Sequence, residues 1–205
     1  MKLRHLEMAL ERCAGFTQPR AQLEQYGTPA VIAARLLYHA HLKGDIGGKR
    51  VLDLGCGTGI LACGASLLGA AEVAGVDIDS AAISTARKNA VLLGADVTFI
   101  AGDIGDDTLF PFFCPCNTVV MNPPFGAQKR HADRPFIDRA LACAHVVYGI
   151  FNAGTRPFLE AYIRGRASVD EAIACSFPMK RSFVHHTRDR MEIPVEIVRI
   201  INERR

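Results

Sequence analysis

A glycine-rich turn follows the first strongly apolar β-type run of the chain. After the segment RVLDLG, glycines recur at every second position, as Gly55, Gly57 and Gly59. Glycine permits a tight turn and a close approach of the backbone to a ligand. A predicted strand precedes this turn and a predicted helix, residues 59–70, follows it. This context favours a ligand-binding loop, although the spacing is not the GxGxxG of dinucleotide binders. Asp53 lies inside the predicted strand, where a buried acid needs a partner such as a cationic or amine-bearing ligand.

Acidic residues stand at the ends of the next two predicted strands. Asp77 ends the second, a position from which a carboxylate accepts the two hydroxyls of a bound ribose; Ile78 is expected beside the same ligand. Asp79 reads instead as the cap of the following helix. Asp103 ends the third strand and is suited to accept an adenine amino group, with Ile104 against the ring. Taken alone, each of these aspartates is also compatible with an ordinary carboxylate in a loop. Together with the glycine loop they predict a nucleoside-binding site.

The fourth predicted strand, NTVVM, ends in the stiff turn Asn122-Pro123-Pro124-Phe125. Proline has a fixed φ and no N–H group, so no backbone donor of the two prolines competes for the carbonyl oxygens nearby. The side-chain carbonyl of Asn122 and the backbone carbonyl of Pro123 are suited to accept both hydrogens of a planar NH2 group. Phe125 offers a face on which a planar group can stack. A purely structural Pro-Pro turn is the alternative.

The elements that must position these residues alternate between strand and helix. The β-type runs and helical patterns occupy, in chain order, residues 50–54, 59–70, 72–79, 80–94, 96–103, 117–122, 136–144, 145–151 and 156–166. Such alternation predicts an α/β protein with a parallel sheet covered by helices on both faces. Residues 171–179 and 193–201 predict a terminal hairpin that adds an antiparallel edge. Ligands of these sheets bind beyond the carboxyl ends of the strands, so the candidate residues should converge on one crevice.

Helices precede the sheet. Residues 6–16 carry apolar side chains at helical spacing, and residues 28–42 form a second helical pattern in which Thr28 is the expected N-cap and Pro29 the first helical residue. We expect residues 1–205 to form one domain, with a helical segment at 1–45 and a sheet core at 46–205.

The composition favours a folded protein of the cell interior. Hydrophobic residues make up 49% of the chain and charged residues 22%, which is unlike a disordered protein. No apolar run reaches the roughly 18 residues of a membrane span, and the N-terminus lacks the apolar core of a signal peptide. We therefore expect a cytoplasmic protein. Most of the seven cysteines lie in apolar stretches, as small buried hydrophobes do. The pair Cys114 and Cys116 fits neither a zinc site nor a redox CxxC, so no metal is expected.

Basic residues gather in two segments, although the net charge of +3 does not by itself indicate nucleic acid. One segment directly follows Phe125 and the other lies near the C-terminus. If both flank the site they could hold phosphates; the alternative is two solvated basic loops. The candidate RNA contacts are Lys129, Arg130, Lys180, Arg181, His185, His186 and Arg188.

The motifs VLDLGCGTG, GVDID, GD and NPPF, in this order, resemble the class I S-adenosylmethionine-dependent methyltransferases from about Gln25 onward. The resemblance implies a Rossmann-like sheet of seven strands, mostly parallel, with an antiparallel last strand. It implies S-adenosyl-L-methionine as cofactor, with the glycine loop under its methionine part and Asp77 on its ribose. NPPF is the acceptor motif of members that methylate an exocyclic or amide nitrogen. The implied catalysis is the in-line positioning of nitrogen, carbon and sulfur, which needs no metal.

Three longer stretches, LEQYGTPAVIAARLLYHAH, NPPFGAQ and SFVHHTRDRMEIPVEIVRI, together resemble the small RNA adenine N6-methyltransferases that modify ribosomal RNA of the small subunit in eukaryotes. The resemblance implies that Gln25, Tyr26 and Thr28 belong to a segment that closes over the cofactor. It also implies RNA as partner, and in eukaryotic members a small zinc-binding activator protein. This chain departs from the family at Gly27, where a proline is frequent, and at 185–188, where a lysine-rich stretch is usual. RNA contact through that stretch is therefore less strongly implied than cofactor binding.

Two other functions fit part of the pattern. Protein glutamine N5-methyltransferases of release factors also use NPPY or NPPF, but they usually carry an additional helical domain, whereas about 45 residues precede the first predicted strand here. A non-catalytic RNA-binding protein on a decayed fold is the second alternative. Intact cofactor and acceptor motifs argue against it.

Overall fold

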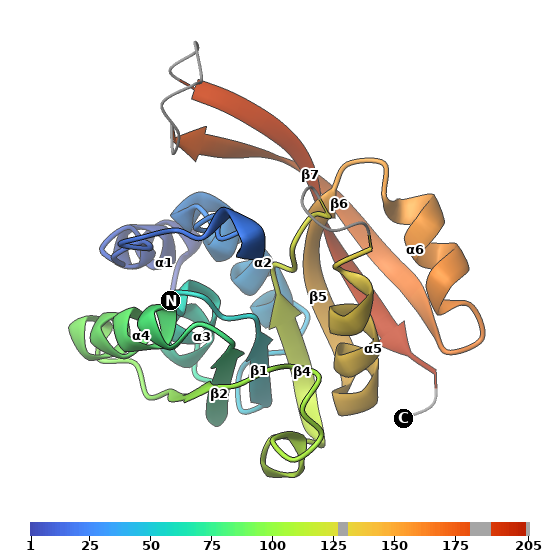
Figure 1. The fold of residues 1–205 in the computed structure, drawn as a ribbon, viewed down its shortest axis with the longest axis horizontal. Helices are drawn as coiled ribbons and strands as arrows, with labels where there is room; N and C mark the ends of the chain where they lie inside the picture. The colour runs from blue at the N-terminus through green and yellow to red at the C-terminus, as the bar shows by residue number, and fades with distance from the viewer. Residues whose placement is uncertain (127–130, 181–189, 204–205) are drawn as a thin grey trace.

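A seven-stranded sheet lies at the centre of the computed structural model, which describes residues 1–126, 131–180 and 190–203 (Figure 1). The strand order is β3-β2-β1-β4-β5-β7-β6. The strands are β1 Arg50–Leu54, β2 Glu72–Asp77, β3 Thr98–Ala101, β4 Cys116–Met121, β5 Ala144–Asn152, β6 Ala167–Lys180 and β7 Arg190–Asn202. Strands β1 to β5 pair in parallel, whereas β7 is antiparallel to both β5 and β6. The expected mostly parallel sheet with an antiparallel last strand is confirmed. The terminal hairpin is also confirmed, but its antiparallel strand β7 lies inside the sheet and β6 forms the edge.

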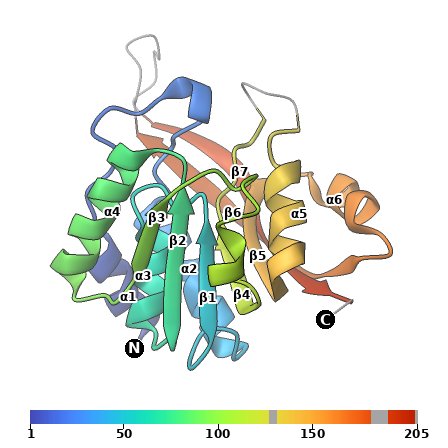
Figure 2. The ribbon, with the colours of Figure 1, turned by 60° about the horizontal axis from the view of Figure 1, so that its bottom comes forward.

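Helices cover both faces of this sheet (Figure 2). One face packs against α1 to α4 and the other against α5 and α6. The helices are α1 Leu3–Leu10, α2 Ala30–Leu42, α3 Ile60–Leu67, α4 Ser80–Leu93, α5 Arg134–Cys143 and α6 Arg156–Ile163, with short 3-10 helices at Ala21–Leu23 and Phe110–Phe112. Successive side chains of a strand alternate between the faces. Thus Val51 belongs to the first core and Leu52 to the second.

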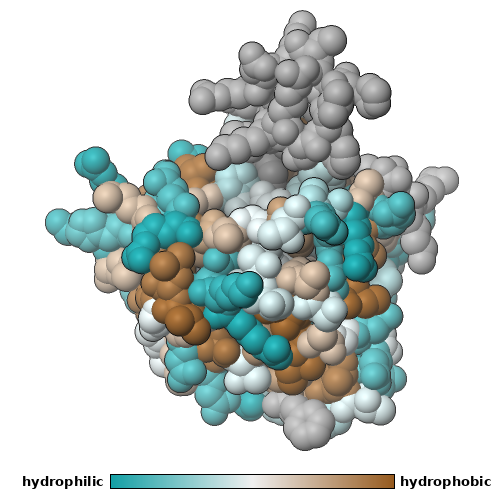
Figure 3. All heavy atoms as spheres, turned by 60° about the vertical axis from the view of Figure 1, so that its left-hand side comes forward, coloured by the Kyte–Doolittle hydropathy of each residue, from teal (hydrophilic) through white to brown (hydrophobic). Residues whose placement is uncertain are grey.

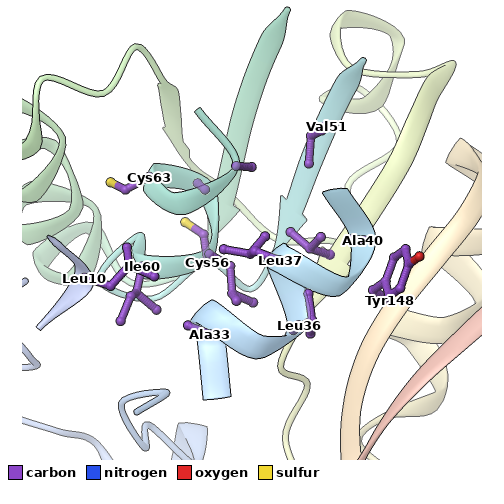
Figure 4. Close-up of a cluster of buried hydrophobic side chains, with 14 of the residues drawn as sticks. Leu10, Ala33, Leu36, Leu37, Ala40, Val51, Cys56, Ile60, Cys63 and Tyr148 are labelled. Carbon is purple, nitrogen blue, oxygen red and sulfur yellow. The ribbon is translucent and has the colours of Figure 1, made fainter. Parts of the chain in front are cut away.

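The helices of residues 1–45 are packed into the first core. Leu36 and Leu37 of α2 are fully buried together with Leu10 of α1 and Tyr148 of β5 (Figure 4). A buried leucine contributes about 1.5–3 kcal/mol through removal of apolar surface from water. Gly64 permits the close approach of α2 and α3, because a Cβ atom at this position would collide with the side chain of Leu37. The N-terminal segment is therefore fixed to the sheet at the side from which it reaches the strand ends.

The two N-terminal helices differ in their boundaries from the sequence-based expectation. α1 ends at Leu10 instead of continuing to residue 16, and only the part that buries Leu6 and Leu10 is helical. The residue before α2 is Pro29, in extended conformation and without a side-chain cap, so the prediction of Thr28 as N-cap is wrong. The hydroxyl of Thr28 has another partner in the site. The expected cap of α4 is confirmed, because Asp79 Oδ1 accepts a hydrogen bond of 3.0 Å from the Ala81 N–H.

The cysteines are not all free hydrophobes. Cys56 and Cys63 are buried thiols, as expected. Cys114 and Cys143, however, form a disulfide bond between the loop before β4 and the end of α5. Their separation of 29 residues follows no recognisable motif, and the contact arises only when α5 packs beside β4.

No helix within residues 1–126, 131–180 and 190–203 is long and apolar enough to cross a bilayer. Over the same residues no group of three or more histidine, cysteine, aspartate or glutamate side chains is arranged to hold a metal ion. On the face that carries the N-terminal helices, hydrophobic side chains form separate small areas among hydrophilic ones (Figure 3).

Candidate active site

A cavity of about 300 Å³ opens at the carboxyl ends of β1 to β4. The sheet order reverses direction between β1 and β4, and such a reversal is where ligands of open α/β sheets bind. Most of the predicted site residues line this cavity. The predicted residues in its wall are Gln25, Tyr26, Thr28, Gly55, Gly57, Asp77, Ile78, Asp103, Ile104, Asn122 and Pro124. The structure therefore brings these predicted residues together in one cavity.

The glycine loop brings the backbone against two aromatic rings. Gly55 and Gly57 have φ angles of +69° and +52°, which favour glycine. A Cβ atom at Gly55 would lie 2.7 Å from Cε1 of Phe136, and one at Gly57 would lie 2.8 Å from Cζ of Phe16. Both rings line the cavity, so side chains on the loop would displace its aromatic walls. Gly59 has a different role, because its Cβ atom would collide with Ala86 of α4 and with Phe99.

Asp77 connects the glycine loop to the end of β2. Its Oδ2 accepts a hydrogen bond of 2.8 Å from the Gly57 N–H, and its Oδ1 accepts one of 2.9 Å from the Asp79 N–H. Burial raises the pKa of this carboxyl, and the two N–H donors oppose that rise. Each carboxylate oxygen keeps further acceptor capacity toward the cavity. The side chain can therefore shape the loop and bind two hydroxyl groups at the same time.

Asp53 lies beneath the loop and not in the cavity wall. Its side chain is buried, and its Oδ2 accepts a hydrogen bond of 3.0 Å from the Ala62 N–H of α3. Its Oδ1 has no hydrogen-bond partner within the described part of the chain. Burial raises the pKa of Asp53 to about 8. The partner that the sequence left open is thus a helix N–H group, and the structure does not bring Asp53 into contact with the cavity.

The wall at the ends of β2 and β3 is suited to a planar apolar ring with a polar edge. Ile78 is 57% exposed and lies in the cavity wall, where it offers an apolar surface to a ligand. Ile104 lies in the same wall, and its carbonyl accepts a hydrogen bond of 2.8 Å from Arg139 Nε. Asp103 is exposed, and its Oδ1 accepts a hydrogen bond of 2.8 Å from the Gly105 N–H.

The N-terminal segment is fastened over the cavity by Gln25. Its Nε2 donates a hydrogen bond of 2.8 Å to Asp79 Oδ2, and its Oε1 accepts one of 2.8 Å from the Arg20 N–H. The hydrogen bond from Gln25 is the largest contribution that lowers the pKa of Asp79. Tyr26 and Thr28 follow directly in the cavity wall. Together with the ion pair of 3.9 Å between Arg20 Nη2 and Asp79 Oδ1, Gln25 thus joins the segment before α2 to the start of α4.

Asn122 has one half of its amide occupied and the other half free. Its Nδ2 donates a hydrogen bond of 3.0 Å to Thr28 Oγ1. Its Oδ1 is buried and has no hydrogen-bond partner among the residues that the structure describes. A buried carbonyl oxygen without a donor is costly, so such a group calls for a ligand. Pro123 is buried, and Pro124 lies in the cavity wall.

Phe125 lies beside the described cavity wall and not in it. Its half-buried ring packs against the first core, to which α2 belongs. Among the wall residues that were not identified from the sequence are Phe16, Pro135 and Phe136. They come from the loop after α1 and from the start of α5, and nothing in their local sequence distinguishes them from ordinary loop and helix residues.

The predicted RNA contacts fall mostly outside the described residues. Lys129, Arg130, Arg181, His185, His186 and Arg188 are among these. Lys180 ends β6 at the same edge of the sheet as the cavity.

Several known proteins are similar to this chain in sequence and in fold. Residues 36–104, which include the glycine loop, match the family described as ribosomal protein L11 methyltransferase (PrmA). The rRNA N(6)-adenosine-methyltransferase METTL5 of Danio rerio is 34% identical, over 97% of this chain and 98% of its own. The rRNA N(6)-adenosine-methyltransferase Mettl5 of Drosophila melanogaster is 37% identical, over 78% of this chain and 77% of its own. A solved structure, described as a candidate RNA methyltransferase from Pyrococcus horikoshii, is 36% identical, covers 98% of each chain and has a TM-score of 0.89.

Proposed function

This chain belongs to the family of rRNA N(6)-adenosine-methyltransferases, and we propose that it transfers the methyl group of S-adenosyl-L-methionine to N6 of an adenosine in ribosomal RNA. The amide of Asn122 is the observation that carries this proposal. Its Oδ1 is buried without a donor, at the cavity and next to a turn of two prolines. An amino group of the substrate supplies the missing donor.

The cavity wall fits the cofactor. Gly55 and Gly57 leave room for the methionine part, since any side chain there would collide with Phe136 or Phe16. Asp77 can accept hydrogen bonds from the ribose hydroxyls. Ile78 and Ile104 offer apolar contact to the adenine ring, and Asp103 accepts a hydrogen bond from the adenine amino group. We assign Gln25 and Tyr26 to covering the bound cofactor. Gly59 and Asp53 support the loop from behind, because Gly59 packs on α4 and Asp53 holds the start of α3.

The residues of the NPPF turn would orient the acceptor nitrogen. The lone pair of an exocyclic amino group is delocalised into its ring, which makes the nitrogen a weak nucleophile. If Asn122 Oδ1 and the Pro123 carbonyl accept its two hydrogens, the nitrogen becomes pyramidal and its lone pair points out of the ring plane. The bound cofactor supplies an electrophilic methyl group on a sulfonium. Catalysis then consists mainly of alignment. The amide oxygen is a hydrogen-bond acceptor and not a base, so the proton that N6 loses passes to solvent.

Thr28 fixes which end of the Asn122 amide faces the substrate. Because Thr28 Oγ1 accepts the hydrogen bond from Nδ2, the carbonyl oxygen is left for the amino group. The reverse orientation would present two N–H donors to another donor. Thr28 is in this way a positioning residue for the acceptor, in addition to a part of the covering segment.

The acceptor base must be accessible outside a duplex. Sequence-specific RNA recognition targets unpaired bases, which can stack on aromatic side chains. We retain Phe125 as the stacking residue, since it directly follows the proline turn. Lys129, Arg130, Lys180, Arg181, His185, His186 and Arg188 remain the candidate contacts to the RNA backbone.

Three further expectations belong to this proposal. Residues 1–205 act as one methyltransferase domain, because the N-terminal helices share a core with the sheet and also supply Thr28. The enzyme acts in the cytoplasm, where ribosomal RNA is accessible. A small zinc-binding activator protein assists it. The last expectation is checked by comparing the methylation rate of the purified chain alone with the rate after addition of such a protein.

The decisive experiment is transfer of tritiated methyl groups from S-adenosyl-L-methionine. Three acceptors are offered in parallel: deproteinised ribosomal RNA, a homopolymer of uridine and a release-factor peptide with its acceptor glutamine. We expect label in ribosomal RNA alone and N6-methyladenosine after digestion to nucleosides. The variant Asn122→Ala is the matched control for contaminating methyltransferases. Label on the peptide and none on RNA would assign the protein to glutamine methylation.

A further inference from the structure

Three aromatic rings form a row that begins at the rim of the cavity. The ring of His131, which lines the cavity, stacks on Phe158 with 6.3 Å between centroids and 22° between planes. Phe158 in turn stacks on Tyr162 with 5.7 Å between centroids and 23° between planes. His131 is exposed, and the other two rings are half-buried. The row therefore leads from the site outward along α6.

Two arginines lie over the same rings. The guanidinium carbon of Arg134 is 5.2 Å from the Phe158 centroid and 5.1 Å from the Tyr162 centroid. That of Arg166 is 5.1 Å from the Tyr162 centroid. Arg166 is anchored, because its Nη1 donates a hydrogen bond of 2.6 Å to Asp138 Oδ1. For Arg134, the buried Nε has no hydrogen-bond partner in the described ranges 1–126, 131–180 and 190–203. We call His131, Arg134, Phe158, Tyr162 and Arg166 the aromatic-arginine track.

The track lies at the edge of the sheet from which the substrate must approach. Both α5 and α6 begin at the carboxyl edge, because a helix that follows a parallel strand starts where that strand ends (Figure 2). Arg134 is the first residue of α5, and Phe158 lies in the first turn of α6. Of the acidic side chains nearby, Asp138 is paired with Arg166 and Glu160 with Arg156. Arg134 therefore remains available to an anion.

We propose that the aromatic-arginine track holds the single-stranded RNA that flanks the target adenosine. This inference rests on the proposed function, since it assigns a surface to the same substrate. Aromatic faces that bind bases, combined with cations that bind phosphates, are the chemistry of single-strand recognition. The rings already contact one another and Arg134, so a base lies against the exposed ring of His131 at the end of the row and not between the rings. The guanidinium groups reach the phosphates beside it.

Two variants and one matched control test the track. Arg134→Gln removes a cation and keeps a polar side chain of similar length. Phe158→Leu removes a ring and keeps an apolar side chain on α6. The control, Arg4→Gln, removes the charge of an exposed arginine on α1, a helix that packs on the opposite face of the sheet from α6. Affinity for a fluorescein-labelled single-stranded RNA with one adenosine is measured by anisotropy at several salt concentrations.

The variants are expected to differ in a way that a structural role alone would not produce. Arg134→Gln should bind RNA at least about threefold more weakly and reduce the slope of log affinity against log salt by about 1. Phe158→Leu should bind about fivefold more weakly, since lost stacking affects every sequence. Arg4→Gln should bind as the wild type does. The dissociation constant for S-adenosyl-L-methionine should stay within about twofold of wild type in all three variants, because none of them touches the cofactor side of the cavity.

The outcomes separate this inference from the proposed function. If both test variants bind RNA with wild-type affinity and slope while the wild type methylates RNA, the track is not an RNA surface and the proposed function stands. If the wild type neither binds nor methylates RNA, both fail. Should Phe158→Leu not fold, the salt slope of Arg134→Gln decides alone. Wild-type RNA binding by both variants, combined with loss of activation by an added protein, would assign the surface to a protein partner and overturn the inference.

Discussion

The hydroxyl of Thr28 and the amide of Asn122 are joined by a hydrogen bond of 3.0 Å, although the two residues are 94 positions apart. The bond links the segment before α2 with the end of β4. It consumes the donor end of the amide and leaves Oδ1 without a partner among the described residues. Closure of the N-terminal segment and orientation of the acceptor group are therefore coupled.

Thr28→Val is expected to slow methyl transfer by about tenfold while the affinity for S-adenosyl-L-methionine changes little, because the amide loses its fixed orientation but the cofactor wall keeps its shape. Thr28→Ser retains the hydroxyl and should stay near the wild-type rate. Single-turnover kinetics and calorimetry separate the two effects. A loss in the serine variant and none in the valine variant would point to packing of the γ-methyl group instead of the hydrogen bond.

Asn122→Ala is expected to lower the methyl-transfer rate by about 100-fold or more, since the acceptor nitrogen loses its positioning group. Cofactor affinity should remain nearly intact. The measurement is the single-turnover rate at saturating RNA and cofactor. Near-wild-type activity in this variant would contradict the role assigned to the NPPF turn.

Asp77→Asn is expected to weaken S-adenosyl-L-methionine binding by about 2 kcal/mol or more, because two ribose hydroxyls lose a charged acceptor. Asp96→Asn, an exposed carboxyl in the loop before β3, is the control and should bind normally in titration calorimetry. Since burial raises the pKa of Asp77, wild-type affinity should begin to fall at a higher pH than for an exposed aspartate as the solution is acidified. The asparagine variant should lack that dependence.

Gly57→Ala is expected to reduce cofactor affinity by about tenfold or more, because the new Cβ atom would lie 2.8 Å from Phe16 in the cavity wall. The matched control is Gly94→Ala. Gly94 has a φ of +64° but no heavy atom within 4 Å of its ideal Cβ position. Both variants should lose about 1 kcal/mol of stability from the left-handed backbone, and only Gly57→Ala should lose affinity. Equal cofactor affinity of the two variants would contradict the role of Gly57 in bringing the loop backbone close to the cofactor.

Asp53 is expected to make the stability of the protein decrease with rising pH. Its pKa is raised by burial to about 8 in the folded state, from the usual 3.8, so the folded state binds the proton more tightly than the unfolded state. The stabilisation is complete below the unfolded pKa and is lost as pH rises toward the folded pKa. Asp53→Asn stays neutral and keeps an acceptor for Ala62. Between pH 5 and pH 8, urea unfolding without cofactor should show the wild type losing about 1 kcal/mol or more relative to this variant. If the free energy of unfolding of the wild type and of Asp53→Asn changed in parallel with pH, the raised pKa of Asp53 would be contradicted.

The sequence by itself determined the order of the strands and helices and the position of the crevice. A strand, a glycine turn and a helix are local features, and parallel strands bring their carboxyl ends to one edge. Gly55, Gly57, Asp77 and Asn122 could therefore be assigned to one cavity from their places after predicted strands. Their order along the chain also carried the resemblance to the methyltransferases.

The tertiary structure alone decided which distant side chains meet. Phe16 and Phe136 enclose the glycine loop, Gln25 reaches Asp79, and Cys114 meets Cys143, yet none of these contacts follows from spacing along the chain. The same holds for the place of β7 between β5 and β6. Such contacts depend on the close packing of segments far apart in sequence, where a shift of one helix turn would join other residues. Thr28 illustrates the difference. Its place directly before Pro29 predicts a helix cap, whereas in the packed molecule its hydroxyl accepts a hydrogen bond from Asn122 Nδ2.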